Sequence, residues 1–342
     1  MQNIHQVRPV TASSCRTCHE KQFVHFSQGK HAQAWEIMQA WPAFHHNSDL
    51  DENSKDCTYC HSVGFKTESE IRVLRGQDDA TGAMACANCH KGHAYSVQQS
   101  WKSNACLPCH QGQHTPQMQA YAGSPHGRLF SAQSGGKNHD STNAPTCQTC
   151  HFADTMHNTQ TAWGSLGLAL PLPDDPQWAK ARKLIMQGLG LSGPENEAGP
   201  REKLLAQHKI VPLSIGRWTM RRDRMEDICM QCHEPKIVQS TFAWTDNILR
   251  TADLNMAKAL EILICMGREG LLGKEKKVDY RPDIGYFDPS FHPAEKTVYT
   301  MFHSFRTQAW QGAMHGNWEM AREGLNRMKD TIEQLKEMEA GE

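Results

Sequence analysis

Apolar residues recur at helical spacing most clearly towards the C-terminus of the chain. After Asp253, which can cap a helix, Met256, Leu260 and Ile264 fall on one face of a segment that ends at Leu272. A second stripe with the same spacing consists of Leu325, Met328, Ile332 and Leu335. The pattern predicts two amphipathic helices, the second packing either within the chain or against another subunit.

The longest strongly apolar run is LEILICM, which begins at Leu260. It is far shorter than the roughly 20 residues that a membrane-spanning helix needs, so we expect a soluble chain. The 342 residues suffice for two ordinary domains, and 36 basic against 37 acidic side chains leave almost no net charge. This balance argues against a nucleic-acid partner.

Cysteine and histidine change this picture. Twelve of the 13 cysteines fall into six copies of the pattern C-x-x-C-H. This is the attachment signature of c-type haem, in which two thioethers hold the porphyrin and the adjacent histidine can reach the iron. The expected attachment residues are Cys15, Cys18, Cys57, Cys60, Cys86, Cys89, Cys106, Cys109, Cys147, Cys150, Cys229 and Cys232. The expected proximal ligands of six haem c groups are His19, His61, His90, His110, His151 and His233.

Two other uses of cysteine fit the pattern less well. Structural zinc sites combine paired half-sites, and zinc does not require a histidine directly after the second cysteine in every copy. A disulfide framework suits a small secreted chain better than one of 342 residues, and it leaves the six histidines without a role. The remaining cysteine, Cys265, lies in the first amphipathic segment and is expected to be a buried thiol.

Haem attachment has consequences for location and folding. It requires reduced cysteines that meet haem outside the cytoplasm, so we expect a periplasmic or cell-surface protein. The start MQNIHQVRPV lacks a charged segment followed by an apolar core, so any secretion signal is expected to have been removed or replaced. Each haem also offers two apolar faces, around which a chain with 38% hydrophobic residues can close a core.

We therefore predict a mainly α-helical multihaem cytochrome, with short helices and loops wrapped around the haems and longer helices at the C-terminus. Residues 1–240 carry all six motifs, and residues 241–342 form a helical region that packs on the haem core. No linker-like segment separates them, so we expect one continuous domain.

A low-spin electron-transfer haem needs a second axial ligand, and histidine is the usual one at low potential. His93 and His114 follow their motif histidines by about one helical turn on the same side, so neither can reach the opposite face of its own haem. Each is expected to serve a neighbouring haem, which requires closely packed porphyrins. Further candidates are His31, His126, His157 and His315.

Several segments follow one another in a recognisable order. They are CANCHKGHAYSVQQSWKSNACLPCHQGQHTPQMQAYAGSPHGRLF, NAPTCQTCH, RWTMRRDRMEDICMQCH and ADLNMAKALEILICMGREGLL. In motifs, order and spacing they resemble the hydroxylamine oxidoreductase family of multihaem cytochromes, over roughly residues 50–330.

This resemblance implies roles for particular residues. The distal ligands that it implies are His93, His114, His126 and His157, in agreement with the geometric argument. It also makes the haem of Cys57, Cys60 and His61 the counterpart of the family's catalytic haem, with a five-coordinate iron. In the family a histidine beside an acidic residue lines the open face of this haem. The stretch KNHDSTNAPTC supplies His139 as the candidate proton-transfer residue, with Asp140 or Asn138 beside it.

Two departures from the family bear on activity. Family members usually carry eight haems, and the missing pair would lie at the N-terminal side, so electrons must leave by a shorter path. In oxidising members a tyrosine from the C-terminal region is crosslinked to the catalytic haem, whereas this region holds only Tyr280, Tyr286 and Tyr299. The resemblance therefore favours reduction, for example of nitrite or hydroxylamine.

Two functional classes stay open. In the first, the open iron binds a small nitrogen compound, His139 moves protons, and five bis-histidine haems relay electrons. In the second, the protein only conducts electrons, as a subunit of a complex or a chain of cytochromes. A sulfur-oxyanion reductase on a related multihaem arrangement is a third, weaker alternative. Redox proteins, either other cytochromes or quinone-linked carriers, are the expected partners, and the resemblance implies a homotrimer.

Overall fold

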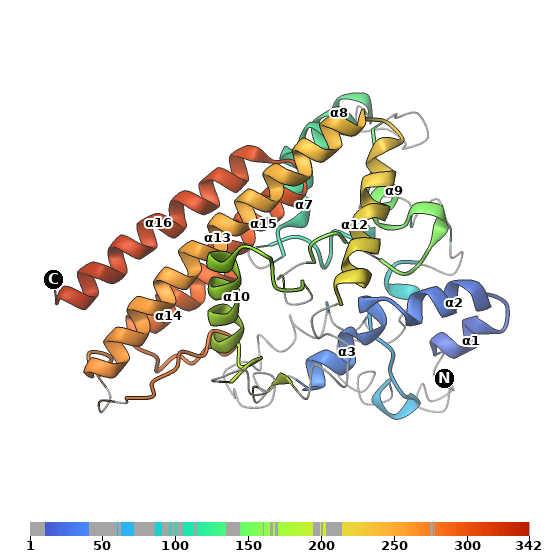
Figure 1. The fold of residues 1–342 in the computed structure, drawn as a ribbon. Coiled ribbons are helices and arrows are strands. Elements are labelled where there is room, and N and C mark those ends of the chain that lie inside the picture. The colour runs from blue at the N-terminus through green and yellow to red at the C-terminus, as the bar shows by residue number, and fades with distance from the viewer. Residues whose placement is uncertain are drawn as a thin grey trace. The chain divides into compact units, whose positions relative to one another are not determined.

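The computed structural model describes most of the chain, and Figure 1 shows these parts in colour. The described residues are 11–40, 60, 63–71, 86–90, 96, 100, 105–112, 115–134, 144–159, 161–164, 167, 170–193, 199, 201–202, 214–273, 276 and 278–341. The secondary-structure elements in these ranges are helices, without a strand among them, which confirms the predicted mainly helical fold. Among the described helices we find no segment with the length and hydrophobicity of a transmembrane span.

The chain forms two compact units, one of Met1–His110 with Gly136–Thr161 and the other of Gln111–Gly135 with Ala162–Glu342. The first contains α1 (Ala12–Arg16), α2 (Glu20–Ser27), α3 (Lys30–Ala40), η5 (Cys86–Asn88), α9 (Cys147–His151) and η8 (Ala153–Thr155). The second contains α7 (Gln117–Gly123), α8 (Pro125–Ser134), α10 (Pro176–Gly188), α12 (Ile215–Met230), α13 (Pro235–Glu269), α14 (Pro293–Thr300), the π-helix η10 (Met301–Arg306), α15 (Thr307–Met314) and α16 (Trp318–Ala340).

The longest of these helices, α13, has clear start and stop signals. Pro235 occupies its first position, where a missing N–H costs nothing, and Gly270 ends it with a left-handed φ of 81°. Asp253 therefore lies inside the helix, and the prediction that it caps a helix was wrong. The physical reason is that the buried apolar face continues upstream of Asp253, through Phe242 and Leu249.

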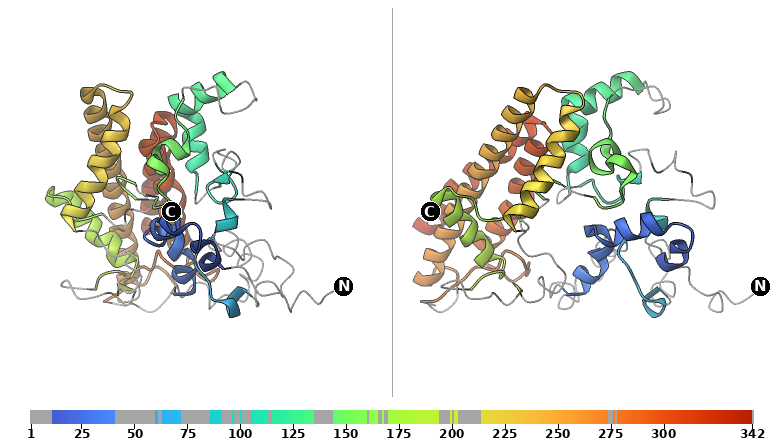
Figure 2. Two further views of the ribbon diagram at one scale, coloured as in Figure 1. Left: turned by 90° about the vertical axis from the view of Figure 1, so that its right-hand side faces the viewer. Right: turned by 45° about the vertical axis from the view of Figure 1, so that its right-hand side comes forward.

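Asp253 instead joins three helices of the second unit. Its carboxylate is fully buried and accepts hydrogen bonds from Arg306 Nε at 2.9 Å and Arg306 Nη2 at 2.7 Å. It also accepts one from Arg182 Nη1 at 3.3 Å and one from Trp178 Nε1 at 2.8 Å. A buried carboxylate needs such partners to offset its lost hydration. This cluster fixes α10 and η10 against α13, and Figure 2 shows α10 beside α13 from two sides.

The C-terminal helices form a bundle in which α13, the η10–α15 segment and α16 lie side by side (Figure 1). Met328, Ile332 and Leu335 of the predicted second stripe are buried, so this stripe packs within the chain. Gly324 permits a close approach of α16 to α15, because a Cβ atom at this position would lie 2.5 Å from the backbone nitrogen of Ala309.

Cys265 is exposed, so the prediction of a buried thiol was wrong. It shares the outer face of α13 with Glu261 and Glu269, at positions one turn away on either side. Its Sγ lies 3.8 Å from Oε1 of Glu269. The period of the helix, rather than the hydrophobicity of the surrounding segment, decides its exposure.

Candidate haem-attachment and axial-ligand sites

The five C-x-x-C-H motifs that the structure describes in full each adopt a tight helical turn. The backbone N–H of the motif histidine donates to the carbonyl of the first cysteine at 2.9–3.0 Å in the motifs that end at His19, His90, His110 and His233. In the fifth, the motif forms α9 itself, and Thr146 caps this helix through a reciprocal bond with Thr149. Residues three and four positions apart share a helix face, so both thiols and the imidazole point to one side. This arrangement fits haem attachment.

Several predicted residues lie outside the described part of the chain. They are Cys57, His61, His93, His114, His139 and Asp140. Of the motif at positions 57–61, only Cys60 is described. His315 is described, and its Nδ1–H donates to the carbonyl of Gln311 at 2.9 Å, which leaves Nε2 as the ring nitrogen that can bind a metal.

The first pair of facing histidines joins two motif regions of the first unit. The ring centroids of His90 and His157 are 6.1 Å apart, and the ring planes differ by 18°. Phe152 packs edge-on against His157, with ring centroids 6.2 Å apart. His157 is thus the histidine that follows the motif at Cys147 by a few residues, yet it faces the histidine of a different motif.

A second pair in the same unit consists of His31 and His110, with ring centroids 6.0 Å apart. Thr159 Oγ1 lies 3.2 Å from Nδ1 of His31 and forms a hydrogen bond with it. Burial, followed by the nearby His110 and His151, lowers the pKa of His31 to about 4. His31 is therefore neutral near pH 7, with one ring nitrogen held by Thr159 and the other able to bind a metal.

The local sequence S-P-H-G presents His126 in the second unit. Pro125 begins α8, and the buried Ser124 hydroxyl accepts the backbone N–H of Gly127 at 3.1 Å. A Cβ atom at Gly127 would lie 2.0 Å from the carbonyl oxygen of Tyr121, so only glycine fits there. Ser124, Pro125 and Gly127 together fix the backbone turn on which the His126 side chain is placed.

His126 faces His233, the motif histidine that follows α12. Their Nε2 atoms are 3.4 Å apart and their ring centroids 5.7 Å apart. Burial, followed by the neighbouring His233, lowers the pKa of His126. The second unit therefore contains its own pair of facing imidazoles.

In each of the three pairs, the distance between the two imidazole rings suits a metal ion bound between them. Two metal–nitrogen bonds of about 2 Å, with about 1.2 Å from each nitrogen to its ring centre, give a separation of about 6.4 Å. The observed centroid distances of 5.7, 6.0 and 6.1 Å are close to this value. The donor set is also suitable, because two neutral imidazoles are common axial ligands of haem iron.

Cysteines of different motifs come together in the first unit, which the sequence did not indicate. The thiol of Cys86 is hydrogen-bonded with that of Cys15, and burial together with this neighbour raises the pKa of Cys86 to about 12. The thiol of Cys106 is hydrogen-bonded with that of Cys147, and this contact together with burial raises the pKa of Cys106. Four attachment motifs therefore adjoin in pairs.

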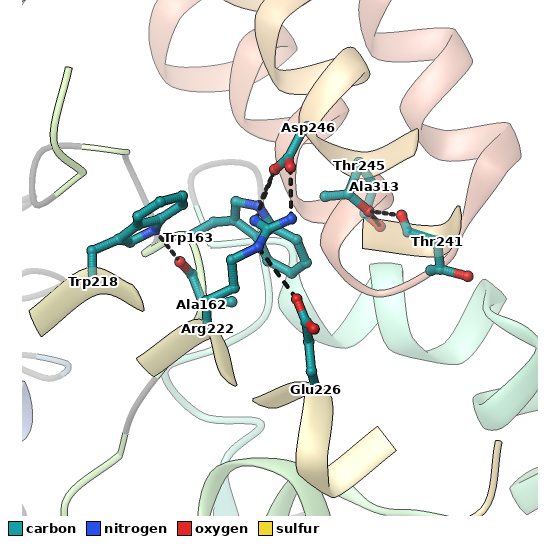
Figure 3. A network of polar contacts seen from close by, with 9 residues as sticks. All are labelled: Ala162, Trp163, Trp218, Arg222, Glu226, Thr241, Thr245, Asp246 and Ala313. Atoms are coloured by element: carbon teal, nitrogen blue, oxygen red, sulfur yellow. Dashed lines mark hydrogen bonds and ion pairs between the residues drawn. The ribbon is translucent and has the colours of Figure 1, made fainter. Parts of the chain in front are cut away.

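Arg222 of α12 is another residue that sequence analysis did not single out. It forms an ion pair with Asp246 of α13 and one with Glu226 of its own helix, as Figure 3 shows. Its spacing in the sequence could have indicated it, because Arg222 lies one helical turn before Glu226, and Glu226 lies one turn before Cys229.

Comparisons with known proteins agree with this chemistry. Residues 14–92 match the family model described as cytochrome c554 and c-prime. A probable nitrite reductase-hydroxylamine oxidoreductase fusion protein of Kuenenia stuttgartiensis is 26% identical over 162 residues. This match covers 42% of the chain and 17% of the relative, so the chain spans only a small part of that protein.

Two solved structures have a similar fold. One is a chain of the reducing HAO-like protein complex of Kuenenia stuttgartiensis, with a TM-score of 0.70, 18% identity and coverage of 96% of this chain and 70% of that chain. The other is a hypothetical multihaem protein, with a TM-score of 0.63, 17% identity and coverage of 97% and 80%. Sequence and fold together therefore support a multihaem c-type cytochrome of the hydroxylamine oxidoreductase-like family.

Proposed function

We propose that the protein carries electrons through c-type haems whose irons are held between pairs of histidines. The observation that carries this proposal is that three motif histidines each face a histidine from another segment. The proposed pairs are His90 with His157, His110 with His31, and His233 with His126. An iron with two imidazole ligands has no position for a substrate, and the chemistry it supplies is one-electron oxidation and reduction.

The segment after the motif at Cys147 supports two of these sites. His157 faces His90, while Thr159, two residues later, holds the ring of His31 opposite His110. One short segment therefore positions ligands for the haems of two other motifs. This sharing supports haem groups that lie close together.

The contacts between cysteines support the same arrangement. Cys15 adjoins Cys86, and Cys106 adjoins Cys147. Each of these sulfur atoms would bind the edge of a porphyrin, so two pairs of porphyrin edges would be brought near each other. Because electron transfer slows steeply with distance, such neighbours favour a relay through the first unit.

Partners and location form part of the proposal. A relay must exchange electrons with other redox proteins, and both cytochromes and quinone-linked carriers are chemically suitable partners. One structural neighbour is itself part of a protein complex. We propose six haem c groups, a periplasmic or cell-surface location, and assembly as a homotrimer.

A second candidate function is reduction of a small nitrogen compound at the haem of Cys57 and Cys60. The observation that favours it is the sequence match to the nitrite reductase-hydroxylamine oxidoreductase fusion protein. In this proposal His61 would hold the iron of this haem, which would bind nitrite or hydroxylamine, and His139, with its sequence neighbour Asp140, would exchange protons with the substrate.

Electron paramagnetic resonance of the oxidised holoprotein distinguishes the two functions. A relay in which every iron has two histidine ligands gives only low-spin signals, unchanged by nitrite or hydroxylamine. An enzyme gives one high-spin or aquo ferric signal that shifts when either compound is added and is altered in His139→Ala. If the unmodified holoprotein shows mainly high-spin signals, the paired-histidine proposal itself is contradicted.

A further inference from the structure

Helix α12 ends in the haem-attachment motif of the second unit, yet none of its residues is fully buried. Its apolar side chains Ile215 and Met220 are 68% and 64% exposed. Among the described residues, this helix is held to its neighbours mainly by polar and aromatic contacts. These contacts are made within about four turns of His233, the motif histidine that follows the helix.

Arg222 makes most of these contacts. Its Nη1 and Nη2 donate to the two carboxylate oxygens of Asp246 at 3.1 and 2.6 Å, and its Nε lies 3.4 Å from Glu226. The guanidinium also lies over the rings of Trp163 and Phe242, at 5.5 and 5.0 Å from their centroids. A bidentate pair combined with ring stacking is a geometry that arginine forms and lysine does not.

Two tryptophans complete this network, as Figure 3 shows. Trp218 lies under the same guanidinium at 5.5 Å, and its Nε1 donates to the carbonyl of Ala162 at 3.0 Å. Trp163 donates from Nε1 to Oδ1 of Asp246 at 2.6 Å. The network thus ties α12 both to α13 and to the segment at Ala162.

The same network brings charge to the attachment site. Glu226 precedes Cys229 by three positions on α12, so the two side chains share a helix face. Burial raises the pKa of the Cys229 thiol, and the negative charge of Glu226 raises it further. Asp246 is the second carboxylate of this network, and Arg222 is the cation that pairs with both.

We propose that Arg222 is a positioning residue for the haem attached through Cys229 and Cys232, and that its balance with Glu226 and Asp246 sets the reduction potential of that haem. This inference rests on the proposed function, because it needs a haem at this motif. The ferric state carries one more positive charge than the ferrous state. A nearby carboxylate therefore stabilises the ferric state and lowers the potential, whereas a nearby guanidinium raises it.

The two charges predict shifts of opposite sign. In Arg222→Gln, both carboxylates lose their compensating cation, and the midpoint potential of this haem falls. In Glu226→Gln, one carboxylate is removed while its shape is kept, and the midpoint potential rises. A role confined to stability would not move the potential in opposite directions.

The experiment is a potentiometric titration of the holoprotein, followed by electron paramagnetic resonance. His126→Met assigns the relevant component, because it replaces the proposed second ligand of the same iron with one that raises the potential. Arg327→Gln, which removes a cation from an exposed pair on α16, is the matched control and leaves this component unmoved. Arg222→Lys keeps the charge but loses the bidentate geometry, so we expect altered g-values with a smaller shift in potential.

The outcomes separate the two levels of the proposal. If no component of the titration responds to His126→Met, the histidine pairing in the proposed function is contradicted. The role of the charge network would be overturned by a haem component that responds to His126→Met but whose midpoint potential is unchanged, or falls, in Glu226→Gln. If Arg222→Gln does not accumulate as folded protein, the sign of the shift in Glu226→Gln still decides.

Discussion

The Nε2 atoms of His126 and His233 lie 3.4 Å apart, although the two residues are 107 positions apart in the sequence. One belongs to the S-P-H-G turn that begins α8, and the other closes the C-x-x-C-H turn after α12. Two separate local structures thus present their imidazoles to the same point. Such convergence is what an iron with two axial ligands requires.

Covalent haem content is the first prediction. Six motifs predict an intact mass that exceeds the 38.6 kDa of the polypeptide by six haem groups. Because thioether bonds are covalent, the haem stays with the protein after denaturation and acid-acetone extraction, as mass spectrometry and absorbance can show. Extraction of the colour into the solvent would refute haem c.

Removal of one distal histidine tests the pairing in the first unit. In His157→Gly, the haem attached through Cys86 and Cys89 loses the second ligand of its iron. We therefore expect one low-spin signal to become high-spin. Added imidazole should restore the low-spin signal, because it can occupy the vacated position. In the control His303→Gln, the replaced ring bonds to the carbonyl of Ile284 at 2.8 Å, and we expect all haem signals to persist. An unchanged spectrum in His157→Gly would exclude the pair with His90.

The buried cluster around Asp253 predicts a large loss of stability. In Asp253→Ala, two buried guanidinium groups lose their only acceptor carboxylate in this cluster, which costs about 3–5 kcal/mol in free energy of unfolding. The measurement is denaturant unfolding followed by circular dichroism. The control Glu323→Ala breaks an exposed pair on α16 and should change stability by less than about 1 kcal/mol. Similar small effects in both variants would contradict the ion cluster.

The close approach of α15 and α16 predicts that Gly324 is intolerant of substitution. Gly324→Ala places a Cβ atom 2.5 Å from the Ala309 backbone nitrogen, so the helices must separate, at a cost of about 1–3 kcal/mol. Gly216 in α12 has no atom within 4 Å of such a Cβ atom. Because Gly216 is only the second residue of α12, Gly216→Ala should stabilise the protein by at most about 0.5 kcal/mol, through the higher helix propensity of alanine. Equal melting temperatures for the two variants would refute the packing argument.

Lys66 predicts a pH dependence of stability in the first unit. Burial lowers the pKa of Lys66 from 10.5 to about 8, against the opposing effect of the charge of Glu70. Between these two pH values the unfolded chain binds more protons than the folded one, so this group makes the free energy of unfolding rise with pH. Its destabilising effect is full below about pH 8 and vanishes above 10.5.

The corresponding experiment compares the native protein with Lys66→Met. Lys66→Met should lack this contribution. As the pH rises from about 8 to 10.5, the melting temperature of the native protein should therefore increase relative to that of the variant. Lys336→Met, at an exposed site of α16, is the control. Parallel melting curves for Lys66→Met and the native protein over this range would contradict the shifted pKa.

The two C-terminal helices show how far periodicity alone extends. It predicted the buried face of α16 correctly, because Met328, Ile332 and Leu335 recur within a few turns. It failed for the start of α13 and for Cys265, because the apolar stripe of α13 begins well before Asp253 and the cysteine falls between its rows. A short window of sequence does not reveal the full length of a helix or the phase of each residue in it.

The sequence by itself determined the chemistry and the local geometry of haem attachment. Two cysteines and a histidine within five residues close one helical turn, and this depends only on neighbours along the chain. The tertiary structure decided which histidine faces which motif, which cysteines adjoin and which carboxylates Arg222 compensates. These relationships join segments far apart in the sequence, and they depend on the path of the whole backbone, which no local pattern encodes.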